Sequence, residues 1–249
     1  MYDLMNREDL GWRRFHQSVS LKAIRALQSA PGPKVLVLDD SIKVRHGKKM
    51  PGVSSHFDHT SGRKVMGQQV LTLGLSGGDG FVPLDSELFT SEVRARGLHQ
   101  PFKDGRSIVA KRYRAAVGQT KPQMARAMVR RAVCAGVKAD YLAADAWFGN
   151  KTTLRTAEES LLTAVLRMKK DQTKYRHTAY RQCQPYQAKA LDVELNLAES
   201  AKGPERWVKV RLLFVRGVVE GDKAQPGKHD WAVFLTTDPG LGVCLASPA

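Results

Sequence analysis

The pattern of apolar and polar positions along the chain indicates an α/β protein. Residues 7–30 carry apolar side chains at helical spacing among arginines and lysines, and Pro31-Gly32-Pro33 predicts the end of that helix. The run 35–40 is short and apolar until its two final aspartates, which is typical of a strand that is buried on both faces of a sheet. The sequence therefore predicts a helix followed by a central strand.

The region after this strand is less regular. Residues 41–62 are basic and rich in Gly, Ser and His, so a loop is predicted there. Loose alternation over 64–75 predicts a strand, and Gly77-Gly-Asp-Gly80 predicts a tight turn into a partner strand at 81–84. Residues 94–118 are basic and irregular, and no helix or strand is predicted for them.

A helix with clear end signals is predicted next. Thr120 is expected to be its N-cap, Pro122 lies in its first turn, and Gly136 lies just past its end. Its expected apolar stripe consists of Met124, Met128, Ala132 and Ala135. The apolar run 141–145 then predicts a strand that ends in an aspartate. The remaining predicted elements are a helix at 151–160 and strands at 161–166, 190–197, 207–215 and 231–237.

The order of these elements favours an RNase-H-like α/β fold, a mixed sheet flanked by helices. In that fold the first and fourth strands are neighbours at the centre of the sheet. The strands beyond residue 168 are interpreted as a β-rich insertion after the fifth strand. The first and fourth strands are also the two that end in aspartate, so both carboxylates are expected at one end of the sheet.

The net charge of the chain indicates an α/β protein that binds a polyanionic partner. Forty Lys and Arg residues against 24 Asp and Glu residues give a formal net charge of +16. Such a surface attracts polyanions, of which nucleic acid is the commonest. The alternative is a charge that serves solubility and has no partner.

Other compositional signals indicate a cytoplasmic protein. The chain has no apolar run long enough for a transmembrane helix, and its acidic N-terminal residues do not resemble a secretory signal. Cys134, Cys183 and Cys244 are far apart and odd in number, so they are expected to be reduced thiols rather than disulfides or a zinc site.

Asp40 and Asp145 are the candidate catalytic and metal-ligating residues. Carboxylates that meet at one edge of a sheet in a basic protein suggest a divalent cation and phosphodiester chemistry. Two alternatives stay open: Asp40 can cap a turn, and Asp145 can cap a helix. Asp39 is the rival of Asp40, but successive strand residues point to opposite faces, and Asp40 is favoured because it directly precedes Ser41 at the strand exit.

Three further features are weighed as candidate sites. His56-Phe-Asp58-His59 has the spacing of metal ligands but no third ligand nearby, so a polar surface loop is preferred. Trp147 and Phe148 could stack on an unpaired base, but packing beside the sheet is preferred. The candidate phosphate contacts are Lys43, Arg45, Lys48, Lys49, Arg112, Arg114, Lys169 and Lys170.

Three segments together resemble a known family: residues 35–53, Gly67-Gln-Gln-Val70, and Leu142-Ala-Ala-Asp145-Ala-Trp-Phe-Gly149. They are similar to bacterial insertion-sequence transposases of the insertion sequence four family, in the DDE, RNase-H-like superfamily. The similarity extends roughly from Pro33 to Asp238. It implies cleavage and strand transfer of double-stranded DNA, at transposon ends and at the target, by a possible homodimer on paired ends near the bacterial nucleoid.

The resemblance also implies a metal site. In the family three acids hold two Mg²⁺ ions, for which Mn²⁺ can substitute. The first two acids correspond to Asp40 and Asp145. The third is a glutamate in a Y-x-x-R-x-x-x-E pattern on a helix that follows the β-rich insertion.

The chain departs from this pattern near its end. It has no glutamate after Glu220 and no Y-x-x-R-x-x-x-E pattern. The expectation is a copy shortened at both ends, with little or no strand-transfer activity. The expected parts are a remnant of a helical DNA-binding region at 1–32, a catalytic core at 33–167, the β-rich insertion and following strand at 168–239, and a tail outside the family pattern at 240–249.

Two other functions stay open. One is a non-catalytic remnant that binds DNA. The other is a different metal nuclease of the RNase-H-like fold, which would need a further acid near the sheet. The candidates for that acid are Asp58, Asp79 and Asp85.

Overall fold

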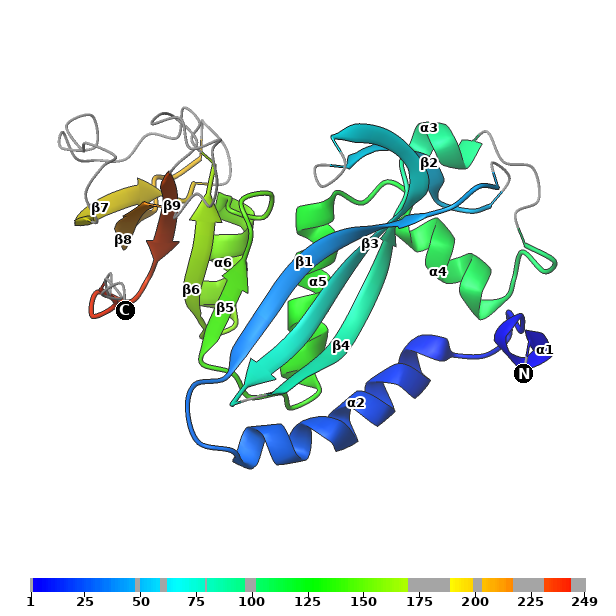
Figure 1. The fold of residues 1–249 in the computed structure, drawn as a ribbon, viewed down its shortest axis with the longest axis horizontal. Helices are drawn as coiled ribbons and strands as arrows, with labels where there is room; N and C mark the ends of the chain where they lie inside the picture. Colours follow the sequence, from blue (N-terminus) through cyan, green and yellow to red (C-terminus); the bar gives the residue numbers. More distant parts are fainter. Residues whose placement is uncertain are drawn as a thin grey trace, which may run out of the picture. The chain divides into compact units, whose positions relative to one another are not determined.

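The computed structural model describes residues 2–47, 50–58, 62–78, 80–96, 102–169, 189–198, 203–216 and 231–242. The chain divides into two compact units, Met1–Ala139 and Asp140–Ala249, and each is described by itself. Each unit by itself combines helices with β-strands (Figure 1). The prediction of a mixed α/β fold is therefore confirmed.

The first unit is built on long antiparallel strands. Its strands are β1 (Val35–Val44), β2 (Val53–Asp58), β3 (Arg63–Gly77) and β4 (Gly80–Phe89). The long strand β3 pairs with each of the other three, and the turn at Gly77–Gly80 joins β3 to β4 as the sequence predicts. Gly78 has a φ of +54°, a value that favours glycine in such a turn.

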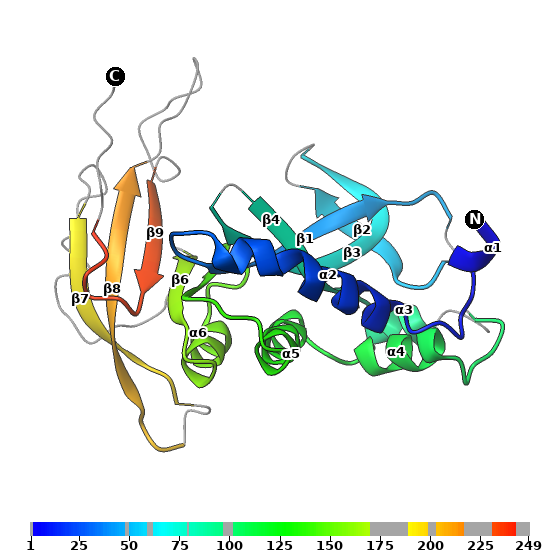
Figure 2. The ribbon, with the colours of Figure 1, turned by 90° about the horizontal axis from the view of Figure 1, so that it is seen from below.

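The first unit also contains helices, several of which contact this sheet. They are α1 (Tyr2–Met5), α2 (Trp12–Ser29), α3 (Glu92–Arg96), α4 (Ile108–Ala116) and α5 (Lys121–Cys134). Helices α2, α4 and α5 all contact β4, and Figure 2 shows α4 and α5 on the same side of the strands. The core between helices and sheet consists of fully buried side chains such as Leu36, Leu38, Leu71, Leu73, Leu75, Met124 and Met128.

Helix α5 has the end signals that the sequence contains. Thr120 and Gln123 form a capping box, with each side chain bonded to the other residue's backbone N–H. Pro122 lies in the first turn, and Gly136, with a φ of +84°, follows the last residues. Met124, Met128 and Ala132 of the predicted stripe are buried, and Ala135 is half-buried.

The second unit contains a mixed sheet. Its elements are β5 (Tyr141–Ala144), α6 (Lys151–Glu159), β6 (Thr163–Met168), β7 (Lys189–Asn196), β8 (Trp207–Arg216) and β9 (Trp231–Thr236). Strands β5 and β6 are parallel, and the antiparallel pairs β6–β9, β9–β8 and β8–β7 extend the sheet. The strands predicted beyond residue 168 are thus present, and they continue the sheet of β5 and β6.

Two predictions about the first unit were wrong. The loop predicted at 41–62 contains the end of β1 and all of β2, because both segments pair with β3. The irregular region predicted at 94–118 contains α4, which begins after the N-cap Ser107 and buries Ala110, Tyr113 and Ala116. Those residues recur every third position, a helical pattern that the many basic residues between them obscured.

The described residues also bear on the predictions about membrane-spanning helices and cysteines. No helix in the described segments is long and apolar enough to cross a bilayer. Cys134 is a free and exposed thiol. Cys183 and Cys244 lie outside the described residues, as do Asp79 and most of the basic stretch between Lys169 and Gln187.

Candidate active site

Asp40 lies in β1 on a polar, partly buried spot. Its Oδ2 accepts hydrogen bonds from Lys121 Nζ at 2.7 Å and from Gln69 Nε2 at 3.1 Å. The Lys121 side chain is only 7% exposed and that of Asp40 is 20% exposed. The Asp40 carboxylate is therefore held by a buried ammonium group.

The strand register explains why these groups meet. Asp40 lies opposite Leu71 of β3, and Gln69 lies two residues before Leu71, so that its side chain points to the same face of the sheet. Phe89 of β4 pairs with Gln69 and lies on that face too. Helix α5 begins over this spot, where Lys121 Nζ is 5.5 Å from the centroid of the Phe89 ring.

His56 of β2 also belongs to the surroundings of Asp40. Burial lowers its pKa from the ordinary value of 6.5, and the positive charge of Lys121 lowers it further. A backbone hydrogen bond with Gly67 and the charge of Asp40 act in the opposite direction. The His56 ring Nε2 is 2.8 Å from Ser54 Oγ. The sequence interpretation placed His56 in a surface loop; it lies instead on a strand, and His59 lies outside the described residues.

Asp145 follows β5 and is exposed. Its Oδ1 accepts hydrogen bonds from the backbone N–H groups of Trp147 at 3.0 Å and Phe148 at 3.3 Å. This is an aspartate turn held by local backbone donors. The alternative reading of Asp145 as a helix N-cap is wrong, because Asn150 caps α6 by accepting from the Thr153 N–H.

The backbone of the turn after Asp145 packs closely against the backbone of β6. A Cβ on Gly149 would lie 2.0 Å from the backbone oxygen of Arg167, so only glycine fits there. Phe148 is fully buried, which agrees with the preferred packing role. Trp147 is 49% exposed instead, and Lys169 Nζ lies 4.1 Å from its ring centroid.

Asp39 lies on the other face of β1, as strand alternation predicts. It is exposed, and its Oδ1 accepts a hydrogen bond from the Asp40 N–H. The preference for Asp40 over Asp39 as a ligand remains a prediction.

Family membership follows from a match over most of the chain rather than from one residue. A family model described as DDE superfamily endonuclease matches residues 1–211, which include both Asp40 and Asp145. The chain belongs to the DDE superfamily endonucleases. No curated protein gives a significant match. Membership indicates a nuclease of the transposase type that acts on DNA, and the mixed sheet with flanking helices is consistent with the RNase-H-like DDE fold.

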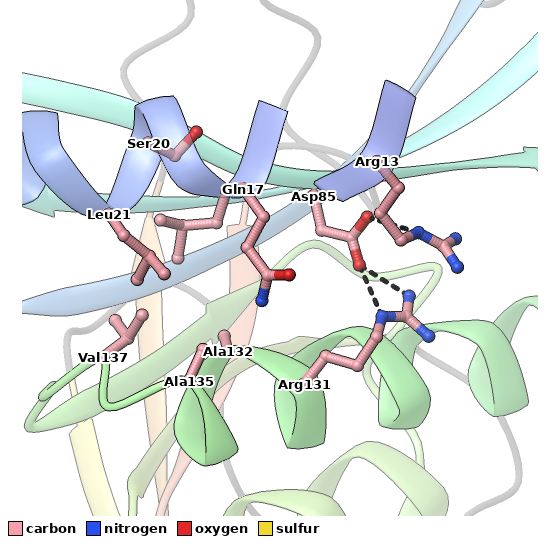
Figure 3. A pocket seen from close by; sticks show the side chains of 10 residues that line it. Arg13, Gln17, Ser20, Leu21, Asp85, Arg131, Ala132, Ala135 and Val137 are labelled. Carbon is pink, nitrogen blue, oxygen red and sulfur yellow. Dashed lines mark hydrogen bonds and ion pairs between the residues drawn. The ribbon is translucent and has the colours of Figure 1, made fainter. Parts of the chain in front are cut away.

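Asp85 of this DDE endonuclease is paired with arginines and is a poor candidate for a third acid. Arg131 Nε donates to its Oδ2 at 2.8 Å, and Arg13 Nε lies 3.3 Å from its Oδ1. Figure 3 shows both arginines pointing at Asp85, one from α2 and one from α5. Glu87, two residues further along β4, pairs with the same two arginines and with Arg112 of α4. One arginine from each of three helices thus attaches that helix to β4.

Arg112 was predicted to contact phosphate, but its guanidinium points into the protein. It donates to the Ser86 carbonyl and lies 3.5 Å from Glu87 Oε2. Burial lowers the pKa of Arg112, as does the charge of Arg13, while Glu87 and Asp85 raise it. The role of Arg112 in DNA binding remains a prediction, and its described contacts are structural.

The other predicted phosphate contacts lie in varied surroundings. Lys43, Arg114 and Lys169 are exposed, whereas Arg45 is half-buried and donates to Gln68 Oε1 at 3.0 Å. Lys48, Lys49 and Lys170 lie outside the described residues.

The donor chemistry of the candidate site fits a divalent cation only in part. Members of the superfamily use divalent metals, and carboxylate oxygens are suitable ligands. Within the described segments, however, no group of three His, Cys, Asp or Glu residues could hold a metal ion. One oxygen of the Asp40 carboxylate already has a cationic partner, because Lys121 Nζ lies 2.7 Å from Oδ2. Asp40 and Asp145 belong to different units, and their convergence on one cation stays a prediction.

Lys121 is the residue that the sequence interpretation missed. Lysine is an unusual choice for the first residue of a helix, because the positive end of the helix dipole repels a cation. Helix α5 also has no acidic residue in its own first turn. Together these two signals could have indicated that Lys121 pairs with a carboxylate elsewhere in the fold.

Proposed function

We propose that this DDE endonuclease is the transposase of a bacterial insertion sequence, which cleaves double-stranded DNA at transposon ends and joins it to a target. The observation that carries the proposal is the family match over residues 1–211, which includes both Asp40 and Asp145. The net charge of +16 supports a DNA partner, because neutralised phosphates release counterions. A homodimer on paired ends, close to the nucleoid in the cytoplasm, completes the proposal.

Asp40 and Asp145 are proposed to hold Mg²⁺, for which Mn²⁺ can substitute. Such a cation polarises the attacking hydroxyl and the phosphate. Exposed Lys43, Arg114 and Lys169 are proposed to contact the DNA backbone, which positions the duplex without reading its sequence. Low strand-transfer activity is expected, because only two acids of the ligand set are identified in this chain.

A non-catalytic DNA-binding protein is the second candidate function. It is favoured by the ion pair between Asp40 and Lys121, and by the lack, within the described residues, of a group of three His, Cys, Asp or Glu side chains that could hold a metal ion. The two functions differ in metal-dependent nicking and agree in DNA affinity.

The test is incubation of the chain with labelled transposon-end DNA and with unrelated DNA, in Mg²⁺ or Mn²⁺. We expect binding to both duplexes that weakens steeply with salt, and weak nicking that Asp40→Asn and Asp145→Asn remove. Asp140→Asn is the control, because Asp140 lies at the other end of β5 and should not affect nicking.

The outcomes separate the candidates. Nicking that survives both aspartate substitutions would contradict the assignment of the site. DNA binding with no nicking under any condition would support the non-catalytic candidate. Robust cleavage that Asp145→Ala abolishes would overturn the expectation of low activity.

A further inference from the structure

We propose that Lys121 is a built-in counterion of Asp40, and that a divalent cation must displace its ammonium group in order to bind that carboxylate. This inference rests on the proposed role of Asp40 as a metal ligand. It adds a positioning residue, since Lys121 would act through Asp40 rather than on the DNA.

The burial of Lys121 is the first argument. A lysine is almost never fully buried unless it is paired, because removing its charge from water is unfavourable. The Lys121 side chain is 7% exposed, and its Nζ donates to Asp40 Oδ2 at 2.7 Å. The face of the Phe89 ring, 5.5 Å from Nζ, also favours a cation at this position.

The position of Lys121 in its helix is the second argument. As the first residue of α5 it lies at the positive end of the helix dipole, where a cation is unfavourable. The α5 helix does not need this lysine for capping, because Thr120 and Gln123 provide the capping box. The negative charge of Asp40 therefore offsets two unfavourable effects on the Lys121 ammonium, its burial and the helix dipole. The two residues are 81 positions apart in the sequence.

A second buried lysine in the same unit shows the contrast. Lys34 is also 7% exposed, but its Nζ donates to the backbone carbonyls of Ala30 at 2.7 Å and Gly32 at 2.6 Å. Those carbonyls follow the end of α2, where a cation is favourable. Lys34 thus has an ordinary structural role, and it serves as the matched control for Lys121.

The distances imply that a divalent cation and the Lys121 ammonium compete for the Asp40 carboxylate. A divalent cation binds a carboxylate oxygen at about 2.0–2.6 Å, and Lys121 Nζ lies 2.7 Å from one oxygen of Asp40. Two cations on one carboxylate repel each other strongly where water is scarce. In the cation-free chain the hydrogen bond from Lys121 holds Asp40 Oδ2 in place. The flexible four-carbon stem of Lys121 lets the ammonium move away when a stronger cation arrives.

The decisive experiment measures Mn²⁺ binding by titration calorimetry in the absence of DNA. Lys121→Met is expected to bind Mn²⁺ about ten-fold more tightly than the unchanged chain, because Asp40 then has no competing cation. Lys121→Arg keeps the charge and should show little of this gain, and Lys34→Met should leave the affinity unchanged. Asp40→Asn/Lys121→Met should lose the gain entirely.

Each result has a distinct meaning. Equal Mn²⁺ affinity in the unchanged chain and Lys121→Met, together with loss of binding in Asp40→Asn, would overturn the counterion role and leave the proposed function standing. Mn²⁺ binding that Asp40→Asn does not affect in either background would overturn both. A purely structural lysine would not tighten metal binding when removed.

A second measurement uses the unchanged chain and does not depend on the folding of a variant. Reductive methylation followed by mass spectrometry reports how accessible each lysine is. Saturating Mn²⁺ is expected to increase the labelling of Lys121 several-fold and to leave that of Lys34 unchanged. Labelling of Lys121 that stays constant while Mn²⁺ binds at Asp40 would contradict displacement.

Discussion

The surroundings of Asp40 and Asp145 differ although each aspartate ends a short apolar run of the sequence. Asp145 directly follows β5, whereas Asp40, expected at a strand exit, lies in the middle of β1 because that strand continues to Val44. Asp40 is 20% exposed and is held by Lys121 and Gln69, which come from another helix and another strand. Asp145 is exposed and is held by backbone N–H groups two and three residues further along the chain. One carboxylate depends on tertiary contacts and the other on a local turn.

Because of this difference, substitutions of the two aspartates should affect the folding stability of the protein unequally. A partly buried charge needs its partner, so changes at Asp40 should affect folding as well as any metal chemistry. A substitution that removes the charge of an exposed carboxylate in a turn should have little effect on the free energy of unfolding. The pair therefore allows the structural and the chemical contributions of an aspartate to be measured separately in one chain.

The largest expected effect is that of Gly149→Ala in the turn after Asp145. The added Cβ would lie 2.0 Å from the Arg167 backbone oxygen, so the turn or β6 must move. The substitution should lower the free energy of unfolding by about 3 kcal/mol or more, measured by chemical denaturation. Gly242→Ala is the control, because a Cβ there meets no atom within 4 Å. A loss no greater than that of the control would show that the turn can relax.

The second effect compares the two aspartates directly. Asp40→Asn leaves the buried ammonium of Lys121 without a charged partner and should lower the free energy of unfolding by about 2–3 kcal/mol. Asp145→Asn keeps an oxygen that accepts from Trp147 and Phe148 and should change it by about 0.5 kcal/mol or less. Asp40→Asn/Lys121→Met should recover much of the loss. Equal effects of the two single substitutions in a denaturation series would invalidate the distinction.

A third effect tests whether the surface beside Asp145 is accessible to nucleic acid. Trp147 is half-exposed with Lys169 over its ring, an arrangement that can stack on an unpaired base and contact its phosphate. Trp147→Ala should weaken binding of a single-stranded oligonucleotide by roughly five-fold, about 1 kcal/mol. The control is Phe15→Ala, which removes a 65% exposed aromatic ring from α2. Fluorescence anisotropy would measure both, and equal losses would argue against a specific role of Trp147.

The smallest effect is a pH dependence near Asp40. The pKa of His56 is lowered, mainly by burial, so the unfolded chain binds a proton more readily than the folded one. Stability from this group is present above the unfolded pKa of about 6.5 and decreases as the pH falls below it. The change should be about 0.5 kcal/mol at most, because the ring is partly exposed. His56→Gln should flatten this part of the profile. A profile that this substitution leaves unchanged would exclude His56 as its source.

Local patterns predicted most of the secondary structure. The capping box at Thr120, the glycine turn at Gly77–Gly80 and the apolar runs of β1 and β5 each identify an element from nearby residues. The polar strand β2 was missed because its pairing with β3, not its composition, makes it a strand. Helix α4 was missed because its three buried residues are separated by arginines and lysines.

The candidate site was predictable only in part. The two aspartates could be identified because each ends an apolar run. The partners of Asp40 could not, since Gln69 and Lys121 are 29 and 81 positions away in the sequence. Likewise, Asp85 and Arg112 carry charges that suggest a site, but the fold pairs them with other charged residues inside the first unit.

The sequence by itself determined most of the elements, the basic charge and the two candidate aspartates, because these depend on composition and on neighbours along the chain; β2 needed its pairing with β3. The local turn at Asp145 belongs to the same category, since its hydrogen bonds span only two or three residues. Only the tertiary structure decided which charges are paired. Burial makes an unpaired charge unfavourable, and the register of β1 with β3 and the start of α5 bring Lys121 to Asp40.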